Sequence, residues 1–321
     1  MKFATLKNGT PDGALALVTP DGTRALEIGS ALPNLLGLLE AWSAGQDALG
    51  QAQQRLSAGE GKAVAIGDFA APLPRSWQWL DGSAFSTHGR LMQIAFGLDP
   101  IDTKRPLMYQ GMSDRFYGPL DDIPFPSAEH GIDFEGEFGV IVDRVPMGTR
   151  AKDAMRHIKL IVQINDWSLR AIAPIEMKTG FGWVQAKPAC SMAPFAVTPD
   201  ELGESWRDGR VRLDLEIDWN GKRFGAANGA AMDFGFHELV AHAALTRELV
   251  AGTIIGSGTV SNDDYQEVGS SCISEVRAIE MIADGAPKTA FMAFGDTIRM
   301  AGRSADGSTP FGLIEQRVVQ A

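Results

Sequence analysis

The sequence predicts a mainly β protein with a few helices, an α+β fold built as a large β-roll or barrel with a small β-rich domain at its N-terminus. Glycine accounts for 36 of the 321 residues, clearly above the roughly 7% of an average protein, which indicates many tight turns. Most apolar runs are short and end at Gly, Pro or Asp, as is typical of strands. Few stretches show helical spacing. At roughly 150 residues per domain, the length allows about two domains.

Residues 1–74 are expected to form the small N-terminal accessory domain. Asn-Gly and Asp-Gly turn signals separate short apolar runs at its start, which predicts hairpins. Residues 30–56 then place leucines at helical spacing, which predicts a helical segment. Pro72 and Pro74 mark the boundary. The main domain is therefore expected to span residues 75–321.

The main domain is predicted to consist mostly of strands. One helix is expected over Gly235–Leu249, where apolar side chains recur at helical spacing. The runs expected as strands are 138–142, 160–164, 211–219, 253–255, 275–282 and 297–300. Strands of unequal length with few helices suggest a large β-roll or barrel.

Composition excludes several classes of partner. The formal net charge is −11 and no Lys or Arg run is present, so nucleic acid is not expected to bind. The richest apolar stretch, Leu32–Trp42, is about half a membrane span, so no membrane association is expected. Cys190 and Cys272 are too few for a disulfide framework or a cysteine-rich zinc site. A reducing, cytoplasmic location fits best.

Two glutamates enter an apolar run and give the sharpest local signal. In a strand, Glu135 and Glu137 share one face, while Phe134 and Phe138 point to the other. Two adjacent carboxylates repel each other unless a cation or protons intervene. Hard oxygen ligands favour Mg²⁺, Ca²⁺ or Mn²⁺ over zinc. A solvated polar strand face is the alternative.

Two further residues could belong to a site. Asp166 closes an apolar run beside Trp167, which suits a ligand position, although an Asp can equally turn the chain and cap the next segment. His88 lies in a polar stretch between aromatic residues that is interpreted as a loop. An imidazole there could act as a base near neutral pH, with a surface or core role as the alternative.

A lysine and a glycine-rich turn complete the candidates. Lys187 lies between Gly182 and Pro188, so its ammonium could be held in a loop and stabilise an enolate or a carboxylate. A solvated lysine is the alternative. Gly256–Thr259 offers amides and a hydroxyl, but without a following helix and lysine it does not indicate a nucleotide site.

Taken in order, these pieces resemble the fumarylacetoacetate hydrolase family over about residues 75–315. The family's D-x-E-x-E strand matches residues 133–137, and its N-D-W-S-x-R segment matches residues 165–170. A metal-binding Asp seven residues before a catalytic His is matched by Asp81 and His88. The resemblance implies these metal ligands: Asp81, Glu135, Glu137 and Asp166.

The same resemblance assigns the other site residues. It implies that His88 is catalytic, that Glu275 orients it and that Lys187 assists. Glu275 lies two residues later than the family pattern places this glutamate, and Glu267 is the second choice. The substrate contacts that it implies are Tyr109, Arg170, Thr259 and Ser83. Ser83 replaces a family tyrosine and Ala173 a family glutamine, which leaves the exact substrate open.

The resemblance implies a metal-dependent hydrolase that cleaves a C–C bond in a 1,3-diketo acid, such as fumarylacetoacetate or an acylpyruvate, in the catabolism of aromatic amino acids or other aromatic compounds. It implies Mg²⁺ or Ca²⁺, with Mn²⁺ as a further option, and a homodimer. A 2-keto acid hydratase or decarboxylase on the same metal scaffold is the alternative enzyme. A catalytically silent binder that kept the metal site is the non-enzymatic alternative.

Overall fold

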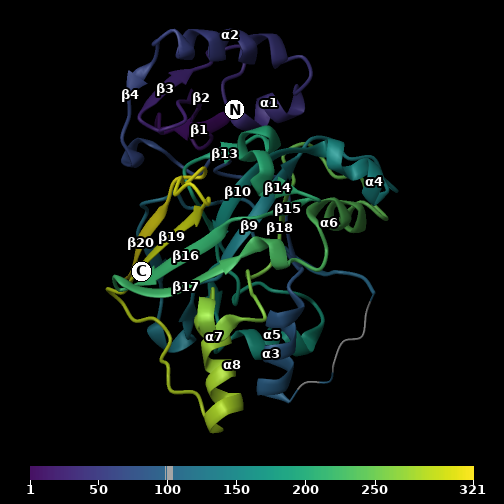
Figure 1. Cartoon of the computed structure of the whole chain (residues 1–321), viewed down its shortest axis with the longest axis vertical. Coiled ribbons are helices and arrows are strands. Elements are labelled where there is room, and N and C mark those ends of the chain that lie inside the picture. The colour runs from purple at the N-terminus through teal and green to yellow at the C-terminus, as the bar shows by residue number, and fades with distance from the viewer. Residues whose placement is uncertain (98, 100–103) are drawn as a thin grey trace.

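One long mixed sheet runs through the molecule in the computed structural model, which describes residues 1–97, 99 and 104–321 (Figure 1). Its neighbouring strands are antiparallel, except for the parallel pair β18 and β5. In spatial order the strands are β4 (Lys62–Ala63), β3 (Arg24–Glu27), β2 (Ala14–Val18), β1 (Lys2–Leu6), β13 (Ala196–Val197), β10 (Ile158–Asn165), β9 (Gly136–Val142), β18 (Ile254–Gly256), β5 (Trp79–Ser83) and β6 (Leu107–Gly111), with β12 (Ser191–Met192) paired to β10. The α+β class, mostly sheet, is confirmed. The path is open in the described residues, so the roll does not close into a barrel.

Smaller sheets and the helices complete the fold. The second sheet contains β17 (Lys222–Asn228), β16 (Asp214–Trp219), β19 (Thr297–Arg303), β20 (Ile314–Gln320) and β7 (Ile123–Phe125). Two short pairs are β11 (Ser168–Leu169) with β8 (Ile132–Asp133), and β14 (Trp206–Arg207) with β15 (Arg210–Val211). The α-helices are α1 (Leu35–Glu40), α2 (Gln46–Ser57), α3 (Ser86–Phe96), α4 (Ala151–Ala154), α5 (Ala173–Thr179), α6 (Phe236–Ala243), α7 (Tyr265–Val268) and α8 (Ile273–Asp284). Short 3-10 turns are η1 (Ile66–Asp68), η2 (Ala128–His130), η3 (Met155–His157), η4 (Pro199–Ser205) and η5 (Gly229–Ala231).

Strand β9 is buried along its whole length because both of its faces are covered. Phe138 and Val140 belong to the core that is shared with the second sheet. On the other face, Ile141 packs in a cluster with Leu35 and Leu38 of the N-terminal helical segment. By strand alternation, Glu137 lies on the Ile141 face. The fold therefore places a carboxylate in the interior, where burial must be compensated.

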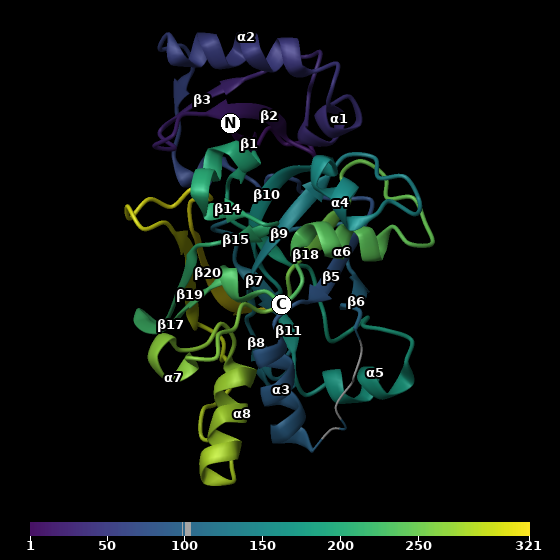
Figure 2. The same ribbon diagram turned by 45° about the vertical axis from the view of Figure 1, so that its right-hand side comes forward.

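The N-terminal region continues the main sheet, because β1 pairs with β13. Helices α1 and α2 lie across this end of the molecule (Figures 1 and 2). The division at residue 74 stays a prediction, since the two parts share one sheet and one apolar cluster. The helical segment expected over 30–56 is two helices, interrupted between Ala41 and Gly45.

The strand expected over 211–219 is divided between β15 and β16, which belong to different sheets. Three further sequence predictions are wrong. Residues 275–282 form helix α8 instead of a strand, and His88 lies in the first turn of helix α3 instead of a loop. The helix expected over Gly235–Leu249 ends at Ala243, and Leu249 instead forms a bridge with Val145. In each case contacts between residues distant in the sequence outweigh the local pattern. The first two backbone N–H groups of α8 donate to Asp133, and the first backbone N–H group of α3 donates to Asp233.

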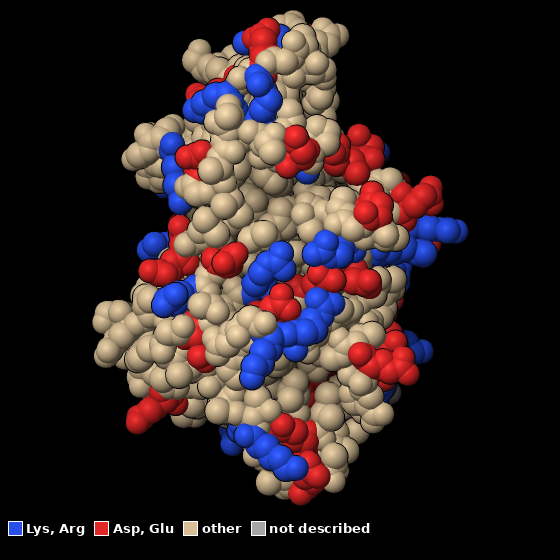
Figure 3. Space-filling model, turned by 60° about the vertical axis from the view of Figure 1, so that its left-hand side comes forward, with Lys and Arg blue, Asp and Glu red and all other residues tan. Residues whose placement is uncertain are grey.

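The surface carries charges of both signs. Over the side of the molecule drawn in Figure 3, acidic and basic side chains are interspersed. On the second sheet, Glu216 pairs with Arg223 and Arg303, and Asp218 pairs with Arg299. No helix in the described part of the chain has both the length and the apolar character that crossing a bilayer requires.

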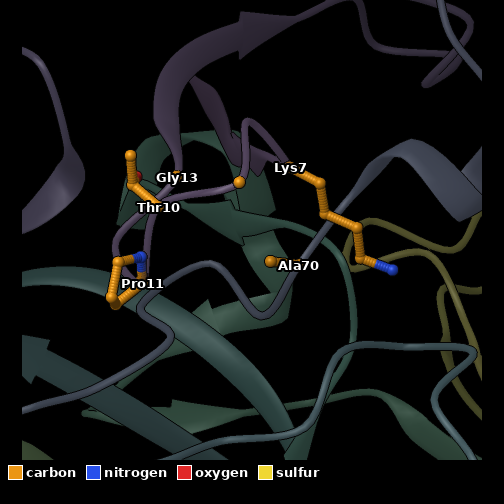
Figure 4. A pocket seen from close by; sticks show the side chains of 6 residues that line it. Lys7, Thr10, Pro11, Gly13 and Ala70 are labelled. Atoms are coloured by element: carbon orange, nitrogen blue, oxygen red, sulfur yellow. The ribbon is translucent and has the colours of Figure 1, made fainter.

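A surface hollow of about 470 Å³ lies in the N-terminal region (Figure 4). Its lining residues are Lys7, Gly9, Thr10, Pro11, Gly13 and Ala70. None of the candidate site residues contributes to it. This hollow is therefore not part of the predicted active site.

Asn34 caps α1, since its side chain accepts the N–H of Gly37 at 2.8 Å. Replacing Asn34 with alanine is expected to lower the free energy of unfolding by about 1 kcal/mol, because that N–H loses its partner. Urea unfolding measures the change. Gln54→Ala on the exposed side of α2 is the control and should change stability by less than about 0.5 kcal/mol. Equal stability of the two variants would contradict this cap.

Candidate active site

Three acids from three separate strands meet inside the protein. Asp81 lies in β5, Glu137 in β9, and Asp166 directly follows β10. One carboxylate oxygen from each lies within 4.8 Å of the other two. Strand pairing brings them together, because β10 pairs with β9, β9 with β18, and β18 with β5. We name Asp81, Glu137 and Asp166 the acid triad.

Close backbone packing fixes Asp81 in the acid triad. Gly256 lies opposite Asp81 in the parallel pair, and a Cβ at Gly256 would clash with Asp81 Oδ1. Gly258 adopts a positive φ and donates its backbone N–H to the same oxygen at 3.1 Å. Glycine is therefore needed at both positions, by close approach at one and by conformation at the other.

The acid triad has the electrostatics of a cation site. Burial, reinforced by the charge of Asp166, raises the pKa of Asp81 well above its usual range. Burial and the charge of Asp81 do the same to the pKa of Glu137. Both Glu137 oxygens are buried and have no hydrogen-bond partner among the described residues. Unpartnered buried oxygens of this kind fit a hard divalent cation.

Glu135 is held by cations of the chain itself. Its Oε2 accepts Lys187 Nζ at 2.5 Å and its Oε1 accepts Arg170 Nη2 at 2.5 Å. Although burial alone would raise the pKa of Glu135, Lys187 and Arg170 hold it well below the usual range. The structure places Glu135 beside the acid triad, whereas the family resemblance had grouped it with the metal ligands.

Lys187 links Glu135 to the acid triad. Its Nζ also donates to Asp166 Oδ2 at 2.6 Å, and the side chain is buried. Burial alone would lower the pKa of Lys187, but Asp166 and Glu135 outweigh burial and raise it. Lys187 is therefore a fixed positive charge at the site. Tyr109 approaches the same oxygen, donating its hydroxyl to Asp166 Oδ2 at 2.6 Å.

His88 and Glu275 come together as expected from the resemblance. The distance from His88 Nδ1 to Glu275 Oε1 is 3.7 Å. Both His88 Nδ1 and Glu275 Oε2 are buried and lack a hydrogen-bond partner among the described residues. Glu267 lies exposed on α7.

Ser261 fixes the carboxylate of Glu275, donating its hydroxyl to Oε1 at 2.5 Å. We expect Ser261→Ala to lower kcat by about 3- to 10-fold, because the carboxylate that faces His88 loses its buried hydrogen bond. Steady-state kinetics at saturating substrate measure this loss. Ser43→Ala is the control, since Ser43 is exposed between α1 and α2. Unchanged kcat in Ser261→Ala would contradict the role.

The remaining expected substrate contacts lie around this centre. Arg170 bridges Glu135 and Asp133. Thr259 is buried in the turn that follows β18, and Ser83 is exposed at the end of β5. No contact joins Thr259 or Ser83 to the acid triad among the described interactions.

Two buried groups at the site were not expected from the sequence. Asp133 accepts the backbone N–H groups of Ile273 and Ser274 and also pairs with Arg170. The Cys190 thiol donates to Asp166 Oδ1 at 3.0 Å. Asp133 is the first acid of the D-x-E-x-E segment, so the motif contained a signal for it. Nothing local marks Cys190.

Family models cover almost the whole chain. The model described as fumarylacetoacetate (FAA) hydrolase C-terminal matches residues 78–319, three quarters of the chain. The chain belongs to the fumarylacetoacetate hydrolase family. A second model, described as fumarylacetoacetase N-terminal domain 2, matches residues 1–75.

Curated relatives of the family share about half of the chain. A 2,4-didehydro-3-deoxy-L-rhamnonate hydrolase of Sphingomonas sp. is 29% identical over 164 residues, covering 50% of this chain and 54% of that protein. The mitochondrial oxaloacetate tautomerase Fahd2a of Rattus norvegicus is 25% identical over 159 residues, covering 49% and 48%. The chain thus spans about half the length of the curated relatives it matches.

Solved structures share the fold at full coverage. Maleylpyruvate hydrolase from Sphingobium sp. SYK-6, in complex with manganese(II) ion and pyruvate, aligns over 100% of both chains with a TM-score of 0.67 and 16% identity. The 5-carboxymethyl-2-hydroxymuconate delta-isomerase from Mycobacterium smegmatis aligns over 100% of this chain and 99% of its own, with a TM-score of 0.63 and 16% identity. Hydrolases, an isomerase and a tautomerase among the relatives support an enzyme.

Proposed function

We propose that the protein is a metal-dependent hydrolase that cleaves the C–C bond of a 1,3-diketo acid, fumarylacetoacetate or a related acylpyruvate, in aromatic catabolism. The observation that carries the proposal is the acid triad, three buried carboxylates set beside Lys187, of which Glu137 has both oxygens without a hydrogen-bond partner among the described residues. The proposed cation is Mg²⁺ or Ca²⁺, with Mn²⁺ as a further option.

Asp81, Glu137 and Asp166 would hold the cation, and Glu135 would join them when Lys187 releases one of its oxygens. A bound divalent cation would polarise the two oxygens of a 1,3-diketo acid. This chemistry requires carboxylates without other partners, and Glu137 meets that condition. In support, a solved relative holds Mn²⁺ together with pyruvate, the acid that hydrolysis of an acylpyruvate would release.

The protein's own groups would supply the proton transfers and the charge. His88, oriented by Glu275, would accept a proton from water as the oxygen adds to the carbonyl distal to the carboxylate. The C–C bond then breaks, its electron pair leaves on the methylene carbon as an enolate, and Lys187 stabilises that negative charge. The proton that His88 accepted would be returned to that carbon, which completes pyruvate, and the acyl part leaves as a carboxylic acid.

Arg170 is the proposed partner of the substrate carboxylate. Its Nη2 reaches Glu135 and its Nε reaches Asp133, so its guanidinium is oriented at the edge of the site. Tyr109 packs edge-on against Trp183 with ring centroids 6.0 Å apart. Together these groups are proposed to bind one carboxylate end and one apolar arm of the substrate, with Thr259 and Ser83 as further contacts.

A substrate panel tests this function. The protein is incubated with acylpyruvates of increasing chain length and with fumarylacetoacetate, in the presence of chelator, Mg²⁺, Mn²⁺ or Ca²⁺, and the products are identified by mass spectrometry. Two carboxylic acids, formed only with added metal, are the expected result. Release of CO₂ would indicate the decarboxylase alternative, and a single product that has gained water would indicate the hydratase.

Two further predictions have tests of their own. Sedimentation of the purified protein measures whether it is a homodimer, and fractionation of the producing cell measures whether it is cytoplasmic. Binding of a diketo acid without any turnover would contradict the enzyme proposal and favour the silent binder.

A further inference from the structure

Asp133, the first acid of the D-x-E-x-E segment, lies between the start of helix α8 and Arg170. Its carboxylate is fully buried and faces three donors from two distant segments. Oδ1 accepts the backbone N–H of Ile273 at 2.8 Å, and Oδ2 accepts that of Ser274 at 2.9 Å. Oδ2 also accepts Arg170 Nε at 2.8 Å.

The first two contacts fix the start of helix α8. The opening N–H groups of a helix have no partner within the helix, and the residue before it usually supplies one. Here Cys272 precedes α8, and its sulfur accepts only the Glu275 N–H, at 3.3 Å. Asp133, 140 residues earlier in the chain, supplies the acceptors for Ile273 and Ser274. An anion at this position is also favoured by the helix dipole.

The position of Glu275 follows from this cap. Glu275 is the third residue of α8, directly after the two residues that Asp133 binds. Helix α8 packs along α3, which carries His88 (Figures 1 and 2). A shift or rotation of the first turn of α8 would therefore change the distance between Glu275 and His88.

The third contact fixes Arg170. Asp133 Oδ2 accepts the Nε–H of Arg170, and in this orientation the Nη2 of the same guanidinium donates to Glu135 Oε1. One carboxylate thus orients the proposed partner of the substrate carboxylate and the glutamate behind the proposed base.

We propose that Asp133 is a positioning residue that fixes the Glu275–His88 pair and Arg170 in their positions relative to each other. The inference rests on the function proposed above for its kinetic consequence, but its structural consequence is independent of any substrate. Removing the second anionic oxygen should loosen the first turn of α8 and release Arg170, while the acid triad, which Asp133 does not contact, stays in place.

Asp133→Asn tests the structural part by hydrogen exchange. An amide offers one acceptor oxygen and presents N–H donors toward Arg170 or the helix, where a carboxylate offered acceptors to both. The backbone amides of Ile273 and Ser274 are expected to exchange at least about 10-fold faster than in the wild type. Asp68→Asn is the matched control, because Asp68 also caps a helical turn, accepting the Ala65 N–H at 2.8 Å. It should leave exchange in α8 unchanged.

Kinetics test the positioning role. We expect Asp133→Asn to lower kcat by about 10- to 100-fold, as small displacements of catalytic groups do, with Mn²⁺ affinity within about 3-fold of the wild type. In a Glu275→Gln background the same substitution should lower kcat by less than about 3-fold, because the carboxylate that it positions beside His88 is already neutralised, while the part that acts through Arg170 should remain as a rise in KM. A loss of kcat that is as large in the Glu275→Gln background as in the wild-type background would overturn the proposal. A wild-type kcat in Asp133→Asn, together with unchanged exchange of the Ile273 and Ser274 amides, would also overturn it.

A second variant and the wild type complete the test. If Asp133→Asn does not fold, Asp133→Glu keeps the buried charge on a longer side chain. It should accelerate exchange of the same two amides and lower kcat by at least about 3-fold, and wild-type behaviour would overturn the proposal. If the wild type hydrolyses no diketo acid, the function fails, whereas faster exchange at Ile273 and Ser274 in the variant still supports the hold of Asp133 on α8.

Discussion

Replacing His88 with alanine is expected to lower kcat by at least about 10²-fold and to leave Mn²⁺ affinity nearly unchanged. General base catalysis typically contributes about 10² to 10⁴-fold. His88 is the imidazole that the structure places beside Glu275, with its Nδ1 3.7 Å from Oε1. It does not belong to the acid triad, so the loss should appear in the reaction and spare metal binding.

Two measurements separate these effects. Saturating acylpyruvate and product analysis give kcat, and calorimetric titration gives the Mn²⁺ affinity of the same preparation. His242→Ala on α6 is the control, because it removes an imidazole outside the described site. Activity near that of the wild type in His88→Ala would exclude this residue as the base.

Glu137→Gln is expected to abolish both activity and metal-dependent stabilisation. With metal at 100 times its dissociation constant, the wild type should gain about 2.7 kcal/mol of stability, which for a chain of 321 residues corresponds to an increase in Tm of about 4 °C. The variant should show a shift below about 1 °C, because a neutral amide is a poor ligand for a hard divalent cation.

The metal-free protein should respond to Glu137→Gln in the opposite direction. The folded-state pKa of Glu137 is raised by burial and by Asp81, so its ionised form destabilises the fold above the unfolded pKa, and the penalty is relieved as pH falls. Removing that charge should leave the metal-free Tm at neutral pH equal to or above the wild-type value. Thermal unfolding with and without chelator measures both effects, and Glu129→Gln on the surface is the control. A metal-induced shift of wild-type size in Glu137→Gln would contradict the ligand role.

The sequence predicted those parts of the site that depend on local pattern. The apolar run after Glu137 predicted a strand there, and Glu137 lies in β9, whereas Glu135 lies between β8 and β9 and belongs to neither strand. The family resemblance then indicated Asp81, Asp166 and Lys187, which the structure brings within reach of one another. Strand pairing, which the sequence does not specify, provides the convergence.

The errors arise where a contact distant along the chain decides the local structure. Residues 275–282 look apolar enough for a strand, yet they form a helix whose first amides are bound by Asp133. His88 follows polar residues that suggest a loop. However, the backbone N–H of Ser86 donates to Asp233, and helix α3 begins at Ser86. The ion pairs of Glu135 likewise depend on Lys187, 52 positions away.

The pairing of β1 with β13 limits how the protein can be dissected. Removing residues 1–74 would leave the edge of β13 that pairs with β1 without a partner and would take away the N-terminal leucines that share an apolar cluster with Leu160 and Val162. An exposed strand edge beside a bare apolar face is a template for aggregation. Expression of the catalytic part by itself should therefore yield an insoluble product, and tags or fusions are better attached without cutting into the first strand.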